Sequence, residues 1–432
     1  MNNLDSIPDN NVSIKQIISW AFYDFATSAY FVVIFTFVFA TYFTDSIALN
    51  TIEGTALWGY TISGSALLIA IVSPFVGAIA DYGGQHKLWL IFFTLLAVIA
   101  IACLWFAYPD SSSIPLVLVC IFVSNFALEV ATVFYNAFLP KLSSSQYIGR
   151  ISGWAWGMGY LGGLICLIIS LSIFVDGRLG FWLGNTESAN IRVVPLFVAV
   201  WVIFFSLPFC FFVKPTHGRY LTPGIAIRTG WSELLCALRG LRGQKDLFLF
   251  LIARMFYIDG LNTLLALGGI YAAGTFGLEI NEIMIFGIII NIMAGIGAAL
   301  FALCDDWMGS KRTVLISLFC LVSTYCFLLT VTSLTLFWLT APVIGVFVGP
   351  IQASSRTLLA RLSKPEEITR MFGLFALSGK ATSFLGPLLV GVVTAFTTSQ
   401  KLGMAMLLPF FLLGGLLMFF VKEPDHHNTR VN

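Results

Sequence analysis

Two stretches, GAIADYGGQHKLWL (77–90) and FALCDDWMGSKRTVL (301–315), decide how this chain is organised. Each lies between two long hydrophobic runs and obeys the pattern Asp-x-x-Gly-x-x-(Lys/Arg). The matching residues are Asp81, Gly84 and Lys87 in the first copy and Asp306, Gly309 and Arg312 in the second. A polar loop that recurs after about half the chain indicates an internal duplication. Membrane proteins built from such repeats are most often secondary transporters.

The repeated loop has a structural and a functional interpretation that nearly coincide. Asp81 or Asp306 can accept backbone N–H groups at the N-terminus of a neighbouring helix, where the helix dipole favours negative charge. The glycine permits a tight turn, and the basic residue anchors to lipid phosphate. Such a contact would hold one conformation shut and release it during transport. We therefore interpret both copies as gating loops, with a simple connector as the alternative for either copy taken alone.

The composition indicates that lipid is the main solvent of this chain. Of its 432 residues, 58% are hydrophobic and only 10% are charged, whereas soluble domains carry about 25% charged residues. The net charge of +2 is too small to indicate a nucleic-acid partner. The eight cysteines include no C-x-x-C, and the four histidines lie in loops or near the C-terminus. We expect no metal, no cofactor and no histidine proton relay.

Hydrophobic runs long enough to cross a bilayer, which takes roughly 20 residues, occur twelve times. The polar N-terminus lacks the basic start of a signal peptide, so we expect the first run to be retained. The expected spans are 17–43, 56–80, 87–107, 114–138, 150–174, 192–213, 247–273, 282–304, 312–332, 334–360, 370–396 and 402–421. This predicts an all-α membrane protein of two six-helix bundles, 1–213 and 247–432. The segment 214–246 would be a cytoplasmic linker carrying an interfacial or a solvated helix.

The distribution of lysine and arginine predicts the orientation. With the N-terminus in the cytoplasm, most basic residues fall in inside segments, and the outside loops hold only Arg178, Arg192 and Lys401. Basic residues concentrate on the cytoplasmic side of membrane proteins. We therefore expect both termini in the cytoplasm.

Six ionisable side chains lie within the expected spans, where each costs several kcal/mol unless it pairs or faces water. They are Asp24, Glu129, Arg254, Asp259, Arg356 and Lys380. One interpretation is a hydrated cavity, in which acids bind an ammonium group or a coupling proton and bases bind a carboxylate or phosphate. The alternative is a set of buried ion pairs that lock helices together, and for Arg356, near a span end, we favour this alternative. Buried pairs are poor net stabilisers, so six purely structural charges would be hard to explain.

A second, weaker duplication supports the first. In the fourth span Asn125, Glu129, Thr132 and Asn136 lie on one helical face, and in the tenth span Gly345, Gly349, Gln352 and Arg356 have the same spacing. Each of these spans leads into a glycine-rich helix, in which Gly153 and Gly373 occupy corresponding positions. We therefore add Gln352 to the candidate cavity, together with Asn262, which shares the polar side of the seventh span with Asp259.

The repeated loop in a twelve-span chain resembles the major facilitator superfamily. Seven strings narrow the resemblance to the autophagy-related vacuole effluxer branch and its bacterial relatives: WAFYDFATSAYF (20–31), FYNAFLPKL (134–142), GRISGWAWGMGYLGG (149–163), ARMFYIDGLNTL (253–264), GGIYAAG (268–274), IQASSRTLLARL (351–362) and FGLFALSGKATSFLGP (372–387). The resemblance implies two bundles that rock around a central cavity lined by spans one, four, seven and ten. It also implies export of amino acids, as in the fungal members.

We predict a secondary transporter of a small polar solute, most simply an amino acid, in a bacterial inner membrane. Asp24, Asp259 and Asn262 are candidates for the solute ammonium or a coupling proton, and Glu129 is the alternative proton carrier. Arg254 and Lys380 are candidates for the carboxylate. A proton-coupled sugar or drug transporter and a non-transporting receptor remain alternatives. No H-E-x-x-H, G-x-S-x-G or P-loop is present, so we expect no enzyme activity, and we expect a monomer in the bilayer.

Overall fold

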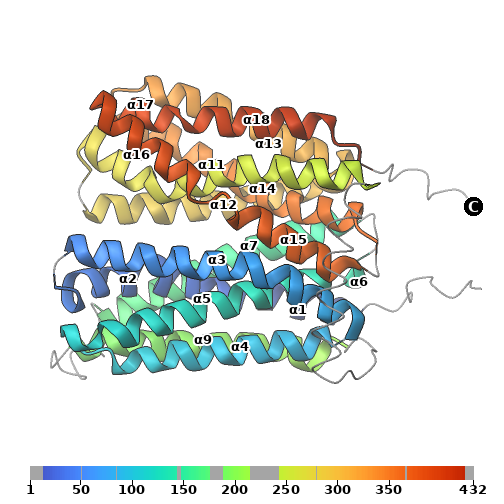
Figure 1. The fold of residues 1–432 in the computed structure, drawn as a ribbon, viewed down its shortest axis with the longest axis horizontal. Coiled ribbons are helices and arrows are strands. Elements are labelled where there is room, and N and C mark those ends of the chain that lie inside the picture. Colours follow the sequence, from blue (N-terminus) through green and yellow to red (C-terminus); the bar gives the residue numbers. More distant parts are fainter. Residues whose placement is uncertain are drawn as a thin grey trace, which may run out of the picture.

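The computed structural model describes residues 13–49, 51–83, 85–143, 147–175, 188–214, 243–278, 280–364 and 367–423. Within these ranges it has twelve helical segments long and apolar enough to cross a membrane, and it contains no strand. The predicted all-α, twelve-span architecture is therefore confirmed (Figure 1). Most of the linker predicted over 214–246 lies outside the described residues, and so does its expected helix.

The first six spans occupy the first half of the chain. The first span consists of α1 (Ile14–Ala29), η1 (Tyr30–Phe37), α2 (Val38–Tyr42) and η2 (Phe43–Ile47), and the second of α3 (Thr51–Gly83). The third consists of α4 (His86–Cys103) and η3 (Leu104–Phe106), and the fourth of η4 (Ser111–Ser113), α5 (Ile114–Ala137) and α6 (Leu139–Leu142). The fifth consists of α7 (Ile148–Ile169) and η5 (Ser170–Val175), and the sixth of α9 (Ala189–Phe212).

The last six spans follow the linker. They are α11 (Lys245–Phe276), α12 (Ile280–Met308), α13 (Ser310–Thr330), α14 (Leu334–Leu362), α15 (Ile368–Lys380) with α16 (Leu385–Thr397), and α17 (Gln400–Ala405) with α18 (Leu407–Phe420). Because the spans alternate in direction, the described ends Ser13 and Glu423 lie on one side of the molecule, here called the termini side (Figure 1).

The eleventh span is broken, which the hydropathy pattern did not predict. Its two helices are separated by the turn Ala381–Phe384. Pro387 explains the break, because it has no N–H for the carbonyl of Ser383 four residues earlier and its ring clashes with that carbonyl. A continuous helix would leave that carbonyl unsatisfied in a region without water.

Glycines bring the two sets of spans close together near the termini side. Helix α7 packs on α12, and α3 packs on α15. A Cβ on Gly153 would lie 2.5 Å from the Cβ of Ala302, and a Cβ on Gly373 would lie 2.5 Å from the Cα of Pro74. The two glycines that corresponded in the sequence thus occupy matching contacts between the sets. Small residues allow this approach, which in lipid stabilises helix association mainly through close packing.

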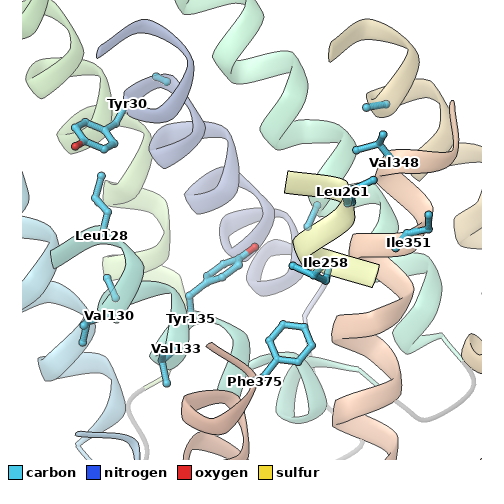
Figure 2. Packing of buried hydrophobic residues seen from close by; sticks show 14 of the residues in the cluster. Tyr30, Leu128, Val130, Val133, Tyr135, Ile258, Leu261, Val348, Ile351 and Phe375 are labelled. Carbon is cyan, nitrogen blue, oxygen red and sulfur yellow. The ribbon is translucent and has the colours of Figure 1, made fainter. Parts of the chain in front are cut away.

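The interior between the helices is filled by large apolar side chains from both sets of spans. Figure 2 shows Leu128 and Tyr135 from α5 within the same packed region as Ile258 and Leu261 from α11. The ring of Tyr135 stacks on that of Trp20 from α1, with centroids 4.5 Å apart. This packing forms the frame that holds the intramembrane charges.

Candidate functional site

Three ion pairs in the described part of the chain join the first six spans to the last six. They are Arg150–Asp306, Asp24–Arg356 and Glu129–Lys380. Each pair thus has its partners on opposite sides of the contact between the two sets of spans. Four of the six expected intramembrane charges are therefore paired across the molecule.

The Asp24–Arg356 pair lies about 15 Å along α1 from its first residue, at 1.5 Å per residue. The Nη1 of Arg356 is 3.2 Å from the Oδ2 of Asp24 and 3.3 Å from the Oδ1 of Asn136. Its Nε and Nη2 donate to the hydroxyl and the carbonyl of Ser152, at 2.9 and 2.6 Å. Tyr135 donates its hydroxyl to Asp24 at 2.9 Å. The guanidinium therefore ties α14 to α1, α5 and α7.

Aromatic rings enclose the same guanidinium. Its central carbon lies 5.0 Å from the ring of Trp20, 5.7 Å from that of Trp156 and 5.8 Å from that of Tyr135. Cation–π attraction stabilises arginine in such surroundings. With its side chain only 3% exposed, Arg356 is closed off from a solute in this conformation, and Asp24 is committed to it.

The Glu129–Lys380 pair is more accessible. Lys380 Nζ donates to Glu129 Oε1 at 2.9 Å, joining α5 to the end of α15 just before the helix break. The two side chains are 23% and 26% exposed, so neither charged side chain is fully enclosed by the protein. Among the paired intramembrane charges, this pair leaves the most room for a solute.

The guanidinium of Arg254 is hydrogen-bonded to groups of α15. Its Nη1 donates to the carbonyl of Phe375 at 2.6 Å and to the hydroxyl of Ser378 at 2.7 Å. Its guanidinium also lies 3.4 Å from the centroid of the Phe375 ring. These contacts connect α11 to α15 and give Arg254 a structural role in this conformation.

The remaining candidates lie apart from the pairs. Asp259 is buried on α11, whereas Asn262, one turn further on, is exposed. Gln352 is half-buried, one turn before Arg356 on α14, and takes no part in the hydrogen bonds of that arginine. The structure thus places four of the eight expected cavity residues in the two pairs Asp24–Arg356 and Glu129–Lys380, and the other four, Arg254, Asp259, Asn262 and Gln352, outside them.

The second polar loop contacts the opposite set of spans. Asp306 Oδ1 accepts the backbone N–H of Arg150, in the first turn of α7, at 3.0 Å, and its Oδ2 lies 3.2 Å from Arg150 Nε. Gly309 has a φ of +93°, which side-chain-bearing residues rarely adopt, and it forms the turn between α12 and α13. Arg312 is exposed.

Of the first polar loop, only Lys87 can be described in full. Its Nζ donates to the carbonyl of Val213, at the end of α9, at 2.7 Å. The side chain of Asp81 and the whole of Gly84 lie outside the described residues. A comparison of the two loop copies is therefore confined to their basic positions.

A buried network beside the second loop was missed by sequence reasoning. Asp305 lies 3.1 Å from Arg361 Nη1, which also contacts Glu423 at 2.9 Å. Glu423 accepts the backbone N–H groups of Ser310 and Lys311 at 3.0 and 2.8 Å, and so caps α13. The adjacent carboxylates Asp305 and Asp306 at the end of α12 indicate a polar contact in the sequence, but Arg361 and Glu423 lie too far along the chain to be recognised as members of the network.

Two pockets lie away from the charges. One, of about 330 Å³, is lined only by α1 and α9, where Phe22 faces residues such as Phe205 and Phe211. The other, of about 70 Å³, lies behind Tyr23. Both are almost wholly apolar, so neither provides the polar groups that a charged solute requires.

Comparisons with known sequences agree on one family. The family model described as "Vacuole effluxer Atg22 like" matches residues 44–429. The MFS-type transporter YxiO of Bacillus subtilis (strain 168) is 29% identical over 417 residues, covering 95% of each chain. Autophagy-related protein 22 of Yarrowia lipolytica is 24% identical over 466 residues, covering 86% of this chain and 77% of the relative.

Solved structures of transporters share the fold. The proton:xylose symporter XylE superimposes with a TM-score of 0.71 at 13% identity, over 95% of this chain and 96% of that one. The major facilitator superfamily transporter FucP, solved in the outward conformation, gives a TM-score of 0.72 at 12% identity, over 95% and 98%. At such identities the likeness concerns the fold alone.

Proposed function

Because this chain belongs to the vacuole effluxer Atg22-like family and is an MFS-type transporter, we propose that its solute is a small zwitterion, most simply an amino acid. The membrane-spanning fold and the family make it a multi-pass integral membrane transporter and not an enzyme. The solute class and its binding residues are the parts that we propose.

The observation that carries the proposal is the partly exposed pair Glu129–Lys380. A zwitterion can enter it without leaving a charge unpaired. Its ammonium replaces Lys380 beside Glu129, and its carboxylate replaces Glu129 beside Lys380, so that one ion pair becomes two. A neutral sugar would separate the two side chains and offer no charge in return, and an unpaired charge in this region is costly.

The position of the pair suits alternating access. Glu129 belongs to the first six spans and Lys380 to the last six, so a solute bound between them contacts both bundles, proposed as 1–213 and 247–432. The Asp24–Arg356 and Arg150–Asp306 pairs lie nearer the termini side and would close that side in the present conformation. Secondary transporters bind solute between such repeats and rock around it.

Two further points of placement are part of the proposal. The distribution of lysine and arginine supports cytoplasmic termini, and the Bacillus relative supports a bacterial cytoplasmic membrane. The rocking bundles need no second copy of the chain, so we propose a monomer as the transporting unit. Transport would run in the efflux direction in which the family is described.

A flux assay on the reconstituted full chain tests the solute class. Proteoliposomes are offered an amino acid, the matching amine without a carboxylate, the matching acid without an amine, and a neutral sugar. We expect flux of the zwitterion alone. A sugar flux that exceeds the amino acid flux would refute the proposal, and no flux of any of the four would favour a receptor role.

Variants of the pair separate binding from a structural role. We expect Glu129→Gln and Lys380→Gln each to weaken solute affinity about ten- to a hundredfold, because each removes a hydrogen bond to a charged group, which contributes about 1.5–3 kcal/mol. The charge-exchanged variant, Glu129→Lys with Lys380→Glu, keeps an ion pair but reverses the polarity of the site. Full flux in this variant would show that the pair only holds helices together. Asp45→Asn, an exposed carboxylate in the same membrane protein, is the control.

A further inference from the structure

Asp259 differs from every other intramembrane charge of this chain in its surroundings. It lies near the middle of α11 with 1% of its surface exposed. Within the residues described, neither carboxylate oxygen has an ion pair, and the groups beside them are the buried hydroxyl of Thr263 and the backbone N–H of Gly386. Residues four apart share one helix face, so the Asp259 carboxyl group and the Thr263 hydroxyl lie side by side.

The side-chain oxygens of Asp259 and Thr263 face the break in the eleventh span. A Cβ on Gly386 would overlap the Thr263 hydroxyl and lie 3.1 Å from Asp259 Oδ1. The two side chains therefore meet the backbone of the first turn of α16. The N-terminus of a helix favours negative charge, whereas burial favours the neutral form of a carboxyl group. A carboxyl group here is stabilised in either state, depending on how closely α16 approaches.

The charged groups around Asp259 are engaged elsewhere. On α11, Arg254 binds the backbone of α15, and Tyr257 shares a hydrogen bond with Ser355 of α14. Lys380 of α15 is paired with Glu129.

The other described helices that pack on α11 provide no counter-ion either. Helices α16 and α18 have no charged residue, and Arg356 of α14 is paired with Asp24. All other charged residues on the helices that contact α11, and on α11 itself, lie at helix ends. The other titratable group on α11, Tyr271, is about three turns from Asp259, at 3.6 residues per turn. No ion pair of Asp259 with these groups occurs among the described residues.

We propose that Asp259, assisted by Thr263, is the site of the proton that drives transport, an inference that rests on the proposed transport function. The step is the binding of one proton to a carboxylate to give a carboxylic acid, and its release again. Among the residues that the structure describes, three side-chain oxygens converge here, those of Asp259 and Thr263, whereas hard metal cations take about six or more oxygen ligands. A proton is therefore the occupant that fits.

The same geometry provides the coupling. The protonated carboxyl is neutral and tolerates the dry position seen here. Loss of the proton leaves a charge that the adjacent α16 N-terminus can stabilise. The proton itself needs a path to water, which Asp259, with 1% of its surface exposed, lacks here, whereas Asn262, three residues away, is exposed. Release thus requires α11 and the broken eleventh span to move relative to each other. The eleventh span also carries Lys380 of the proposed solute site, so protonation and solute binding act on one element.

Infrared difference spectra test the site without any transported solute. The full-length protein in liposomes is compared at acidic and alkaline pH. We expect a band from a protonated, buried carboxyl group in the wild type, its loss in Asp259→Asn, and its shift in Thr263→Val. A band unchanged in Asp259→Asn, or no such band in the wild type, would overturn the proposal.

Flux measurements then test the coupling. We expect Asp259→Asn to lose the accumulation of solute that an imposed proton gradient drives, and its remaining exchange to become independent of pH. Asp259→Glu, which keeps the carboxyl group, should retain pH dependence if the loss in Asp259→Asn is not a folding defect. Asp45→Asn should behave as wild type. Accumulation driven by a sodium gradient instead would overturn the proton assignment.

The two proposals fail in different ways. If no zwitterion is transported, the proposed function fails and the infrared band alone decides whether Asp259 binds a proton. If zwitterions are transported but Asp259→Asn still accumulates them under a proton gradient, the solute site stands and the proton site is wrong.

Discussion

Replacing Asp24 by asparagine should weaken the closure of the termini side. Asparagine has nearly the same size and keeps a hydrogen-bond acceptor for Tyr135, but it removes the negative charge next to Arg356. The guanidinium, with 3% of its side chain exposed, is then left with only neutral acceptors. The pair joins α1 to α14, so its contribution exists only while the two sets of spans are in contact there.

The expected effect follows from the burial of the pair. Removing one partner of a buried ion pair costs about 3–5 kcal/mol. The Asp24 side chain is 19% exposed, and neutral acceptors remain, so the lower end, about 3 kcal/mol, applies. This amount changes the equilibrium between the closed and open termini side by roughly a hundredfold.

Cysteine labelling measures this equilibrium. Ser73 on α3 is fully buried next to Gly373 of α15, and Ser73→Cys is a nearly isosteric change in a chain whose eight natural cysteines are replaced. A maleimide should label Cys at this position much faster after Asp24→Asn, and at the parental rate after the control Asp45→Asn. An unchanged rate in the Asp24→Asn protein would refute the reasoning that this pair holds the termini side closed.

Two further predictions concern packing and stability. Gly153→Leu should abolish flux and lower the thermal midpoint, because its side chain would overlap α12 at the contact with Ala302, whereas Gly415→Leu, with nothing within 4 Å of its Cβ, should be tolerated in both measurements. Arg361→Ala should reduce the free energy of unfolding by about 3–5 kcal/mol, because its carboxylate partners stay buried; the exposed Arg312→Ala is the matched control, and equal losses in the two variants would contradict this account.

The spans were predictable because the signal for each of them is local. In a bilayer every backbone group must be satisfied within its own helix, so a run of apolar residues specifies a span without reference to the rest of the chain. The expected span 370–396 and the observed Ile368–Thr394 illustrate the agreement. Hydropathy alone does not mark the break inside that span, because the break depends on one residue, Pro387, and on the neighbours that tolerate the freed backbone.

The sequence by itself determined that this chain crosses the membrane twelve times and that it is built from a repeat. It also determined that a few charged side chains lie within the membrane spans and need an ion-pair partner or water. Only the tertiary structure decided which of these charged side chains form ion pairs with one another. Three acids and three bases allow several pairings, and the observed partners Glu129 and Lys380 are 251 residues apart. Burial makes an unpaired charge costly wherever it lies, but which charges meet depends on helix packing. That packing pairs Asp24 with Arg356 and, among the described residues, leaves Asp259 without a counter-ion.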